Sequence, residues 1–508
     1  MRVPNSIVGS LFRRREQAPV ALITITVMLG MIMAIIDTTI VNVALNTIGG
    51  NLGATVDEVA WVATGYILAS VIVMPLNGWL TALLGRKRFY AISLGLFTVA
   101  SLLCGTAHSI WVLVFYRVLQ GFGGGALQPT AQAIMFETYP PERRGAAMAI
   151  FGLGAMVGPA IGPVFGGYIV DNASWPLIFY INIPIGIVAF LMTLAFIPNP
   201  KFIEKPKGGI DWTALALLSA GLACLQYVLE RGERDDWFQS STITILAVIS
   251  GVSLIAFIVK SLRDKYPIVE LDVFKFRSFS IGSVLAIVMG FGLYGTALIL
   301  PLFFQSILNF TAFDTGMALL PGALSTAVSM LIIGRILNRV DPRWPIVFGV
   351  LIFAYSTWLL GGLNVQAGYW DVFWPRLIQG FGLGFLFVPL TTVSLSDVPI
   401  HEMAGATGVY TLLRQLGGSF GIAILTTMLT HQTAVAWNVL ASGVTSLHGQ
   451  STGAMTQLVA QQSSMVAYNY LFRVCAIVFV LVTPLIFFIS TKKRTAGAPS
   501  AMAVAAAD

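Results

Sequence analysis

The chain has 508 residues, of which 56% are hydrophobic and only 10% are charged. Soluble globular proteins carry roughly 25% charged residues, and disordered chains are poor in apolar residues, so this composition excludes both classes. The net charge of +7 suits either a nucleic-acid surface or the cytoplasmic loops of a membrane protein. The positions of the charges decide between the two.

Apolar runs long enough to cross a bilayer recur along the chain. A spanning helix needs about 20 mostly apolar residues, and Lys/Arg-rich or Pro/Gly-rich breaks separate most of the runs. They fall at about 19–45, 58–80, 88–107, 110–136, 145–170, 175–197, 212–230, 242–262, 279–307, 314–337, 344–363, 370–395, 404–430 and 467–490. The pattern predicts an all-α polytopic membrane protein with 14 transmembrane helices.

The positive residues set the orientation of these spans. With the N-terminus in the cytoplasm, 23 of the 29 Lys and Arg residues fall in cytoplasmic segments, and only Arg231 and Arg234 fall in an outside loop. Positive residues concentrate on the cytoplasmic side of membrane proteins, so both termini are predicted to be cytoplasmic and no nucleic-acid partner is expected. The first run is too long for a signal peptide and has no small-residue cleavage pattern, so we predict a retained span.

Neither metal nor cofactor chemistry is indicated. The cysteines (Cys104, Cys224, Cys475) and the four histidines are scattered and have no ligand or disulfide spacing. Gly121–Ala126 matches a dinucleotide-binding pattern only formally, because it lies in an apolar helix without a preceding strand. We expect no enzyme activity, no metal and no cofactor, with an ion gradient as the energy source.

An internal repeat relates the two halves of the chain. The segments 117–125 and 376–384 share Arg, Gln, Gly, Phe, Gly and Gly at an offset of 259 residues. The fourth span thus repeats as the twelfth, which fits six spans, two inserted spans and six spans. Repeated halves around a midplane pathway are common in transporters; the alternative is chance similarity between glycine-rich helices.

This division predicts the domain organisation. The expected segments are a cytoplasmic N-terminal segment 1–18, a six-helix bundle 19–197, two inserted helices with cytoplasmic linkers 198–278, a second six-helix bundle 279–490 with an extracytoplasmic loop 431–466, and a cytoplasmic tail 491–508.

Several motifs resemble those of the major facilitator superfamily, and more narrowly the fourteen-span drug:proton antiporters of the EmrB/QacA type. The stretch 37–45 is close to that family's first-span signature, and 175–186 is similar to the start of its sixth span, except that Pro176 replaces a usual Arg. The fifth span resembles the antiporter signature. Its motif residues are Gly154, Gly158, Pro159, Gly162, Pro163 and Gly166.

The loop between spans two and three resembles the superfamily's cytoplasmic loop motif. The matching residues are Gly78, Gly85, Arg86 and Lys87. Ala82 stands where an acidic residue is usual and Leu83 where a basic one is common, which puts the charge relay credited to that loop in doubt.

The resemblance implies the major facilitator fold, an inner-membrane location, and proton-coupled export of lipophilic or amphiphilic drugs by alternating access. It further implies a periplasmic EmrA-like adaptor and an outer-membrane channel as partners. The alternatives are export of a particular metabolite, uptake, or a non-transporting receptor or scaffold that kept the fold.

Asp37 is the only acid deep in an apolar span by this reading. A charge at the bilayer centre costs about 2.5–3.5 kcal/mol on insertion scales and normally faces a partner or a cavity. Counting 1.5 Å per residue from the outer ends of the first and fourth spans places Asp37 and Arg117 at similar depths, so the two are expected to meet. The pair either exchanges protons during transport or is a static link between helices.

Other span residues have candidate roles. Arg376 is the counterpart of Arg117, but the position that matches Asp37 in the ninth span is near Thr296, with no acid close by. Arg376 either binds backbone carbonyls or shapes the substrate path. The fifth-span motif is either a pivot or an ordinary tight packing surface. The candidate substrate path, with interhelical or lipid-facing roles as the alternative, comprises Asn42, Gln128, Tyr294, Phe303, Phe304 and Gln305.

The outside loop 431–466 has no Asp, Glu, Lys or Arg. Trp437, Leu440, Val444 and Leu447 recur at helical spacing and predict one apolar face. An uncharged apolar face on an outside loop is expected to contact either the membrane surface or another protein. The resemblance makes an adaptor the expected partner. The alternative is a hairpin that lies on the outer face of the protein itself.

Overall fold

The computed structural model describes residues 19–200, 206, 208–445 and 452–489. Within these residues the secondary structure is entirely helical. The α-helices are α2 (Val20–Leu52), α3 (Val56–Val73), α4 (Asn77–Leu84), α5 (Arg86–Gly105), α6 (Ile110–Thr138), α7 (Arg144–Asn172), α8 (Leu177–Tyr180), α9 (Asn182–Phe196), α10 (Trp212–Arg231), α11 (Ser241–Arg263), α12 (Arg277–Ser306), α13 (Ala312–Ile336), α14 (Arg343–Leu360), α15 (Tyr369–Ser394), α16 (Met403–Thr445) and α17 (Thr452–Ile486). Short 3-10 helices are η1 (Met74–Leu76), η2 (Pro141–Arg143), η3 (Trp237–Gln239), η4 (Leu271–Lys275) and η5 (Ile400–Glu402).

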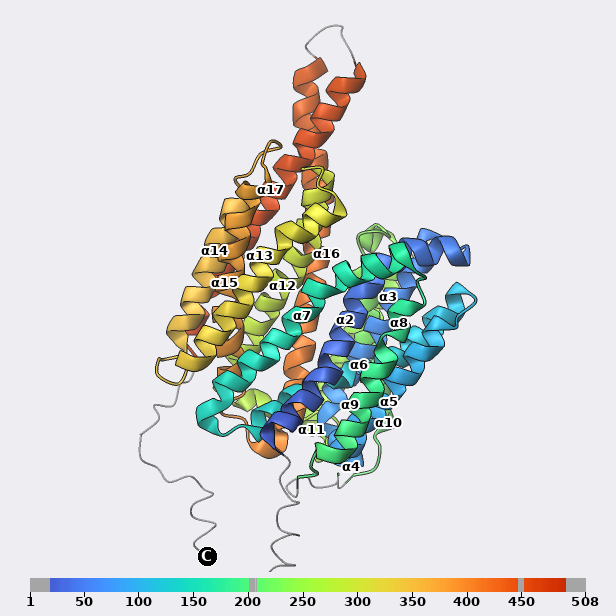
Figure 1. Ribbon diagram of the computed structural model, residues 1–508, viewed down its shortest axis with the longest axis vertical. Coiled ribbons are helices and arrows are strands. Elements are labelled where there is room, and N and C mark those ends of the chain that lie inside the picture. The colour runs from blue at the N-terminus through green and yellow to red at the C-terminus, as the bar shows by residue number, and fades with distance from the viewer. Residues whose placement is uncertain (1–18, 201–205, 207, 446–451, 490–508) are drawn as a thin grey trace, which may run out of the picture.

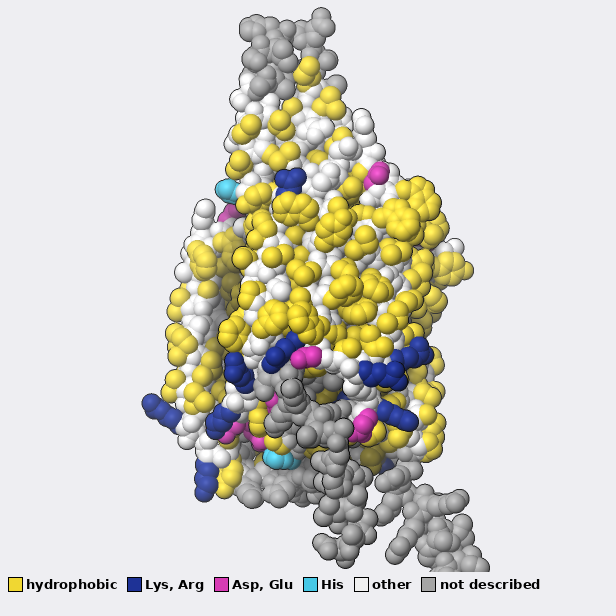
Figure 2. Space-filling model, turned by 90° about the vertical axis from the view of Figure 1, so that its left-hand side faces the viewer, with side chains coloured by type: hydrophobic (Ala, Val, Ile, Leu, Met, Phe, Trp, Pro, Cys, Tyr) yellow, Lys and Arg dark blue, Asp and Glu magenta, His cyan; other side chains and the backbone are white. Residues whose placement is uncertain are grey.

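The helices confirm the predicted class. In the described part of the chain, 13 helical segments are long and apolar enough to cross a membrane, and the 29-residue α7 occupies the place of the fifth predicted span. The described helices therefore agree with fourteen spans. Figure 2 shows a broad apolar belt with Lys and Arg gathered at one end of it, the end toward which the first helix begins.

Two predicted spans are interrupted helices. The second consists of α3, η1 and α4, with Pro75 in the 3-10 turn, because a proline lacks the N–H that an α-helix needs there. The sixth consists of α8 and α9, which are separated at Ile181.

The helices form two bundles with α10 and α11 beside them (Figure 1). α7 packs along α2 of the first bundle and also contacts α13 of the second. α10 and α11 pair with each other, and α10 touches α3 in one bundle and α16 in the other. The inserted pair therefore contacts both halves through α10.

The bundles meet closely at their cytoplasmic end. A Cβ added to Gly78 of α4 would lie 2.7 Å from the Cα of Gly405 in α16, and one added to Gly408 would lie 2.3 Å from the Met74 carbonyl oxygen. The fully buried Asn77 side chain donates a hydrogen bond of 2.7 Å to the Ala404 carbonyl. These backbone contacts close the cytoplasmic side in this conformation.

The stretch 431–466 differs from the predicted loop. α16 runs for 43 residues and α17 for 35, so α16 is about 65 Å long against a hydrocarbon core of about 30 Å. Their outer parts form a helical hairpin that projects beyond the bundles (Figure 1). Its described residues do not lie along the outer face of the protein, which contradicts that alternative. Leu447 is outside the described residues.

Candidate proton-coupling site

Asp37 lies in the middle of α2 and is fully buried. The Nη1 atom of Arg117, from α6, donates to its Oδ2 at 2.5 Å. The Asp37 Oδ1 atom accepts from Gln120 Nε2 at 2.9 Å and from Asn182 Nδ2 at 2.8 Å. Two helices, α6 and α9, thus supply three donor side chains to one carboxylate of α2, and the predicted pair of Asp37 and Arg117 is formed.

Arg117 is fixed from the other side as well. Its Nε donates to the Val62 carbonyl at 3.0 Å, its Nη1 also reaches Gln120 Oε1 at 2.6 Å, and its guanidinium lies 4.4 Å from the centre of the Tyr66 ring. The side chain is 1% exposed. A buried ion pair is tolerated when such additional hydrogen bonds satisfy its remaining donors and lone pairs.

Sequence reasoning missed the roles of Gln120 and Asn182. Gln120 lies one helical turn after Arg117, a spacing that places both on one face. Asn182 lies in the sixth-span motif, and its Nδ2 also contacts Ser101 Oγ at 3.1 Å. Neither spacing nor motif indicated that these amides would converge on Asp37, because the contact depends on how α6 and α9 pack against α2.

The arginine of the cytoplasmic loop motif forms an ion pair. Arg86 pairs with Glu137 at 2.6 Å, and both side chains are nearly buried. Gly85, with φ +80°, ends α4, and the Lys87 backbone N–H donates to Asn199 Oδ1 at 2.9 Å. Ala82 stands in place of an acid. The described contacts of this motif's α4 with the second bundle are those of Gly78 with Gly405 and of Asn77 with Ala404, which involve no charged group.

The glycines of the fifth-span motif face α2. An added Cβ would lie 2.2 Å from a Met28 atom at Gly154, 2.2 Å from Ile35 at Gly158, 2.0 Å from Thr39 at Gly162 and 2.8 Å from Ile40 at Gly166. Thr39 Oγ1 donates across this seam to the Gly158 carbonyl at 3.1 Å. The structure does not describe the side chains of Pro159 and Pro163. The spacing predicted this close approach, while a pivot role stays a prediction.

Arg376 occupies the repeat-related place in α15. Its Nη1 donates to Gln379 Oε1, which matches the Arg117–Gln120 bond of the other half, and its Nε is buried without a partner. Thr296, the counterpart of Asp37, is buried and bonds the Gly292 carbonyl of its own helix. The second bundle therefore lacks the titratable member of the pair.

The candidate substrate-path residues are scattered. Asn42 and Gln305 are exposed, whereas Gln128 and Tyr294 are half-buried. Phe303 and Phe304 are fully buried in an apolar cluster of the second bundle. Their part in a substrate path stays a prediction.

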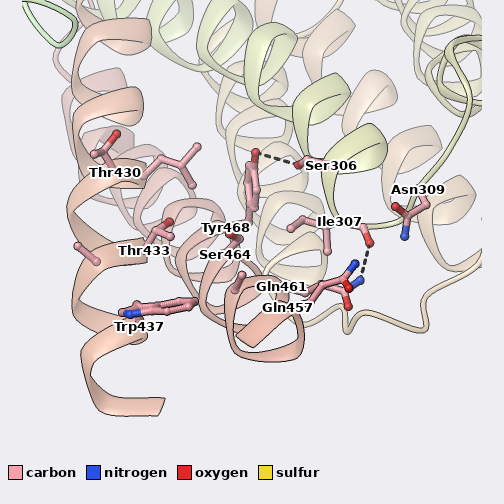
Figure 3. A pocket seen from close by; sticks show the side chains of 13 residues that line it. Ser306, Ile307, Asn309, Thr430, Thr433, Trp437, Gln457, Gln461, Ser464 and Tyr468 are labelled. Carbon is pink, nitrogen blue, oxygen red and sulfur yellow. Dashed lines mark hydrogen bonds between the residues drawn. The ribbon is translucent and has the colours of Figure 1, made fainter. Parts of the chain in front are cut away.

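A cavity of about 910 Å³ lies at the base of the hairpin (Figure 3). α16 supplies Thr430, Thr433 and Trp437, and α17 supplies Gln457, Gln461 and Tyr468. Gln461 Nε2 donates to the Ile307 carbonyl at 3.2 Å, beside the outer end of α12. The lining contains hydroxyls, amides and aromatic rings and no charged side chain.

A family model described as Major Facilitator Superfamily matches residues 27–422. The chain belongs to the major facilitator superfamily. It is a multi-pass protein of the inner membrane, as the sequence predicts.

Curated relatives are similar over nearly the whole length. The "Multidrug export protein EmrB" of Escherichia coli (strain K12) is 35% identical over 93% of this chain and 96% of that protein. A protein of the same name from Haemophilus influenzae is 37% identical over 82% of this chain and 81% of that protein. The "Fatty acid resistance protein FarB" of Neisseria gonorrhoeae is 33% identical over 92% of this chain and 96% of that protein.

A solved structure shares the fold. The human organic anion transporter MFSD10 (TETRAN) superposes with a TM-score of 0.65, covering 92% of this chain and all of that one, at 14% identity. At this identity the likeness concerns the fold alone, and it supports the predicted major facilitator architecture.

Proposed function

We propose that this protein exports lipophilic or amphiphilic drugs and toxic compounds across the inner membrane in exchange for protons, by alternating access between its two bundles. The observation that carries the proposal is the Asp37 site. A buried carboxylate with one guanidinium and two amide donors is a group whose partners change if the helices around it move, and such intramembrane acids mark proton relays. No cofactor is needed, since the proton gradient supplies the energy.

The relatives support the substrate class. Two of them are named multidrug export proteins and a third a fatty acid resistance protein, which fits small amphiphilic compounds as cargo.

The test is the accumulation of a lipophilic fluorescent dye in cells that express the protein, before and after a protonophore collapses the proton gradient. We expect expression to lower dye accumulation only while the gradient stands. Efflux that continues unchanged without the gradient would rule out proton coupling. A receptor or scaffold would give no efflux in either condition.

We also propose that the helical hairpin of α16 and α17 docks a periplasmic adaptor that passes substrate to an outer-membrane channel. Val439 and Leu458 of the hairpin are 66% and 58% exposed, and exposed apolar side chains beyond the bilayer favour a protein partner. Deletion of 436–460 should abolish co-purification of the adaptor and whole-cell resistance. If both survive, the hairpin is not the docking element.

A further inference from the structure

α16 carries a buried arginine that the Asp37 site does not use. Arg414 is 2% exposed and lies about 16 Å along α16 from Met403 at the cytoplasmic end. Its guanidinium lies 5.4 Å from the centre of the Phe387 ring of α15. In the described part of the chain it pairs with no carboxylate, and its Nη1 atom is buried without a hydrogen-bond partner.

Two deeply buried arginines of the first bundle, in contrast, have acids beside them. Arg117 pairs with Asp37, and Arg86 pairs with Glu137. A cation in the membrane interior is costly and normally faces a partner or a water-filled path. The position of Arg414 therefore calls for an anion that the surrounding described residues do not supply.

Three further unsatisfied polar groups lie on α16, α15 and α6. Buried atoms without a hydrogen-bond partner are the Tyr410 hydroxyl, the Thr391 hydroxyl and the Gln132 Nε2. Tyr410 lies one turn before Arg414 on the same face of α16. The Tyr410 hydroxyl lies close to Thr391 and Ser394 of α15 without hydrogen-bond geometry to either. α15 and α16 run in opposite directions, and Thr391 lies one turn after Phe387 on α15. The contact of Arg414 with Phe387 therefore agrees with Tyr410 facing Thr391.

Gln132 brings the first bundle into this group. It lies on α6, and its Oε1 accepts a hydrogen bond of 3.3 Å from Thr411 Oγ1, next to Tyr410. Its Nε2 is left free to donate. The group therefore lies between the two halves, where transporters of this architecture bind their substrates.

The chemistry of these atoms selects a ligand. A guanidinium and an amide nitrogen only donate hydrogen bonds, and the two hydroxyls can donate. A carboxylate only accepts, and its bond to a guanidinium is both charge-assisted and able to be bidentate. Phe387 packs on Phe151 of α7 with ring centres 6.5 Å apart, which offers an apolar wall for the rest of an amphiphile.

We infer that Arg414, with Tyr410, Thr391 and Gln132, binds the carboxylate of a lipophilic anion when the halves separate on the cytoplasmic side. The inference rests on the proposed function and names a substrate class for it. In the present conformation the Gly78–Gly405 contact closes the halves on the cytoplasmic side of this group, and the donors are buried.

The test is equilibrium binding of radiolabelled dodecanoate to the purified full-length protein in lipid nanodiscs. The substitution Arg414→Gln should weaken dodecanoate binding at least tenfold and leave binding of dodecyltrimethylammonium within twofold. Arg414→Lys, which keeps the charge and loses the bidentate geometry, should fall between the two. The matched control is Arg473→Gln, which removes a span arginine that bonds the Gly361 carbonyl and should leave dodecanoate binding unchanged.

Binding of the cation reports that the Arg414→Gln protein is folded. Wild-type dodecanoate affinity in that folded variant would overturn the inference. Binding of dodecanol, which has the same chain length and no carboxylate, is measured alongside. An equal loss of dodecanoate and dodecanol binding would also overturn the inference, because it shows no recognition of the carboxylate. The measurement needs no proton gradient. Asp37→Asn protein that has lost export should still bind dodecanoate through Arg414, so failure of the proposed function and failure of this site are distinguishable.

Discussion

At the residue scale, Asn182 holds the Asp37 carboxylate from α9. Asn182→Ala leaves Asp37 Oδ1 with one donor fewer in a fully buried site, which typically costs about 1–3 kcal/mol. We expect a lower free energy of unfolding for the purified protein, measured by thermal unfolding in detergent. The control is Asn172→Ala, an exposed asparagine whose side chain, within the described residues, bonds the Tyr168 carbonyl of its own helix. An equal loss in both variants would contradict the assigned role of Asn182.

Asp211 at the start of α10 gives a prediction on pH dependence. The Lys260 ammonium 2.8 Å away, assisted by the Ala214 backbone N–H, holds the pKa of the Asp211 carboxyl below its usual range. A lowered pKa means that the carboxylate stabilises the fold above the unfolded-state pKa of about 3.9 and that this stability is lost as the pH falls through the folded-state value. Asp211→Asn should therefore lower the melting temperature at pH 7 and lower it less at pH 3. A loss of the same size at both pH values would show that the charge is not the cause.

The sequence predicts those contacts of the site that follow from charge and depth in the bilayer, and it does not predict those that follow from helix packing. The Asp37–Arg117 pair follows from two charges at one depth in the bilayer. The amides of Gln120 and Asn182 are ordinary polar residues of helices, so their roles emerge only from packing. Arg414 is recognisable as a span arginine, but its lack of an acidic partner among the described residues depends on how α12, α6 and α15 are placed around α16.

At the scale of elements, the glycines of α7 allow its close packing on α2. In Gly162→Ala the new Cβ would lie 2.0 Å from Thr39 Oγ1, and overpacking of this kind costs about 1–3 kcal/mol. Gly167→Ala, on the same helix, meets nothing within 4 Å and should be neutral or stabilising by up to about 1 kcal/mol. Thermal unfolding of the two variants checks the contrast. Equal stability would mean that α7 is not closely packed on α2 in the membrane.

The helices themselves were largely predictable, and the departures have physical reasons. Bilayer thickness fixes the length of an apolar run, so composition finds the spans. It does not find where a helix continues past the membrane: α16 and α17 extend through 431–445 and 452–466 because two facing helices bury part of their uncharged surfaces on each other. The η1 turn at Pro75 lies inside an otherwise apolar run, where hydropathy carries no signal.

At the scale of the whole molecule, the backbone contact of Gly78 with Gly405 closes the cytoplasmic side. Gly78→Val would force side-chain atoms into the space of the Gly405 backbone and should hold the halves apart. A cysteine introduced at Ala149, which is 2% exposed and faces Gly334 of α13, should then react with a membrane-impermeant maleimide in inside-out vesicles at least tenfold faster than without Gly78→Val. Gly50→Val, where an added Cβ meets nothing within 4 Å, is the control. Unchanged reactivity in the Gly78→Val protein would contradict the closing role of this contact.

If the Asp37 carboxylate couples the proton gradient to export, transport driven by an imposed pH gradient in proteoliposomes must depend on that carboxylate. Asp37→Asn is nearly isosteric and removes the titratable group, so we expect gradient-driven dye transport to fall to the level of empty liposomes. Asp171→Asn, an exposed acid near the end of α7, should keep the wild-type rate. Wild-type transport by Asp37→Asn protein under the same gradient would contradict the account.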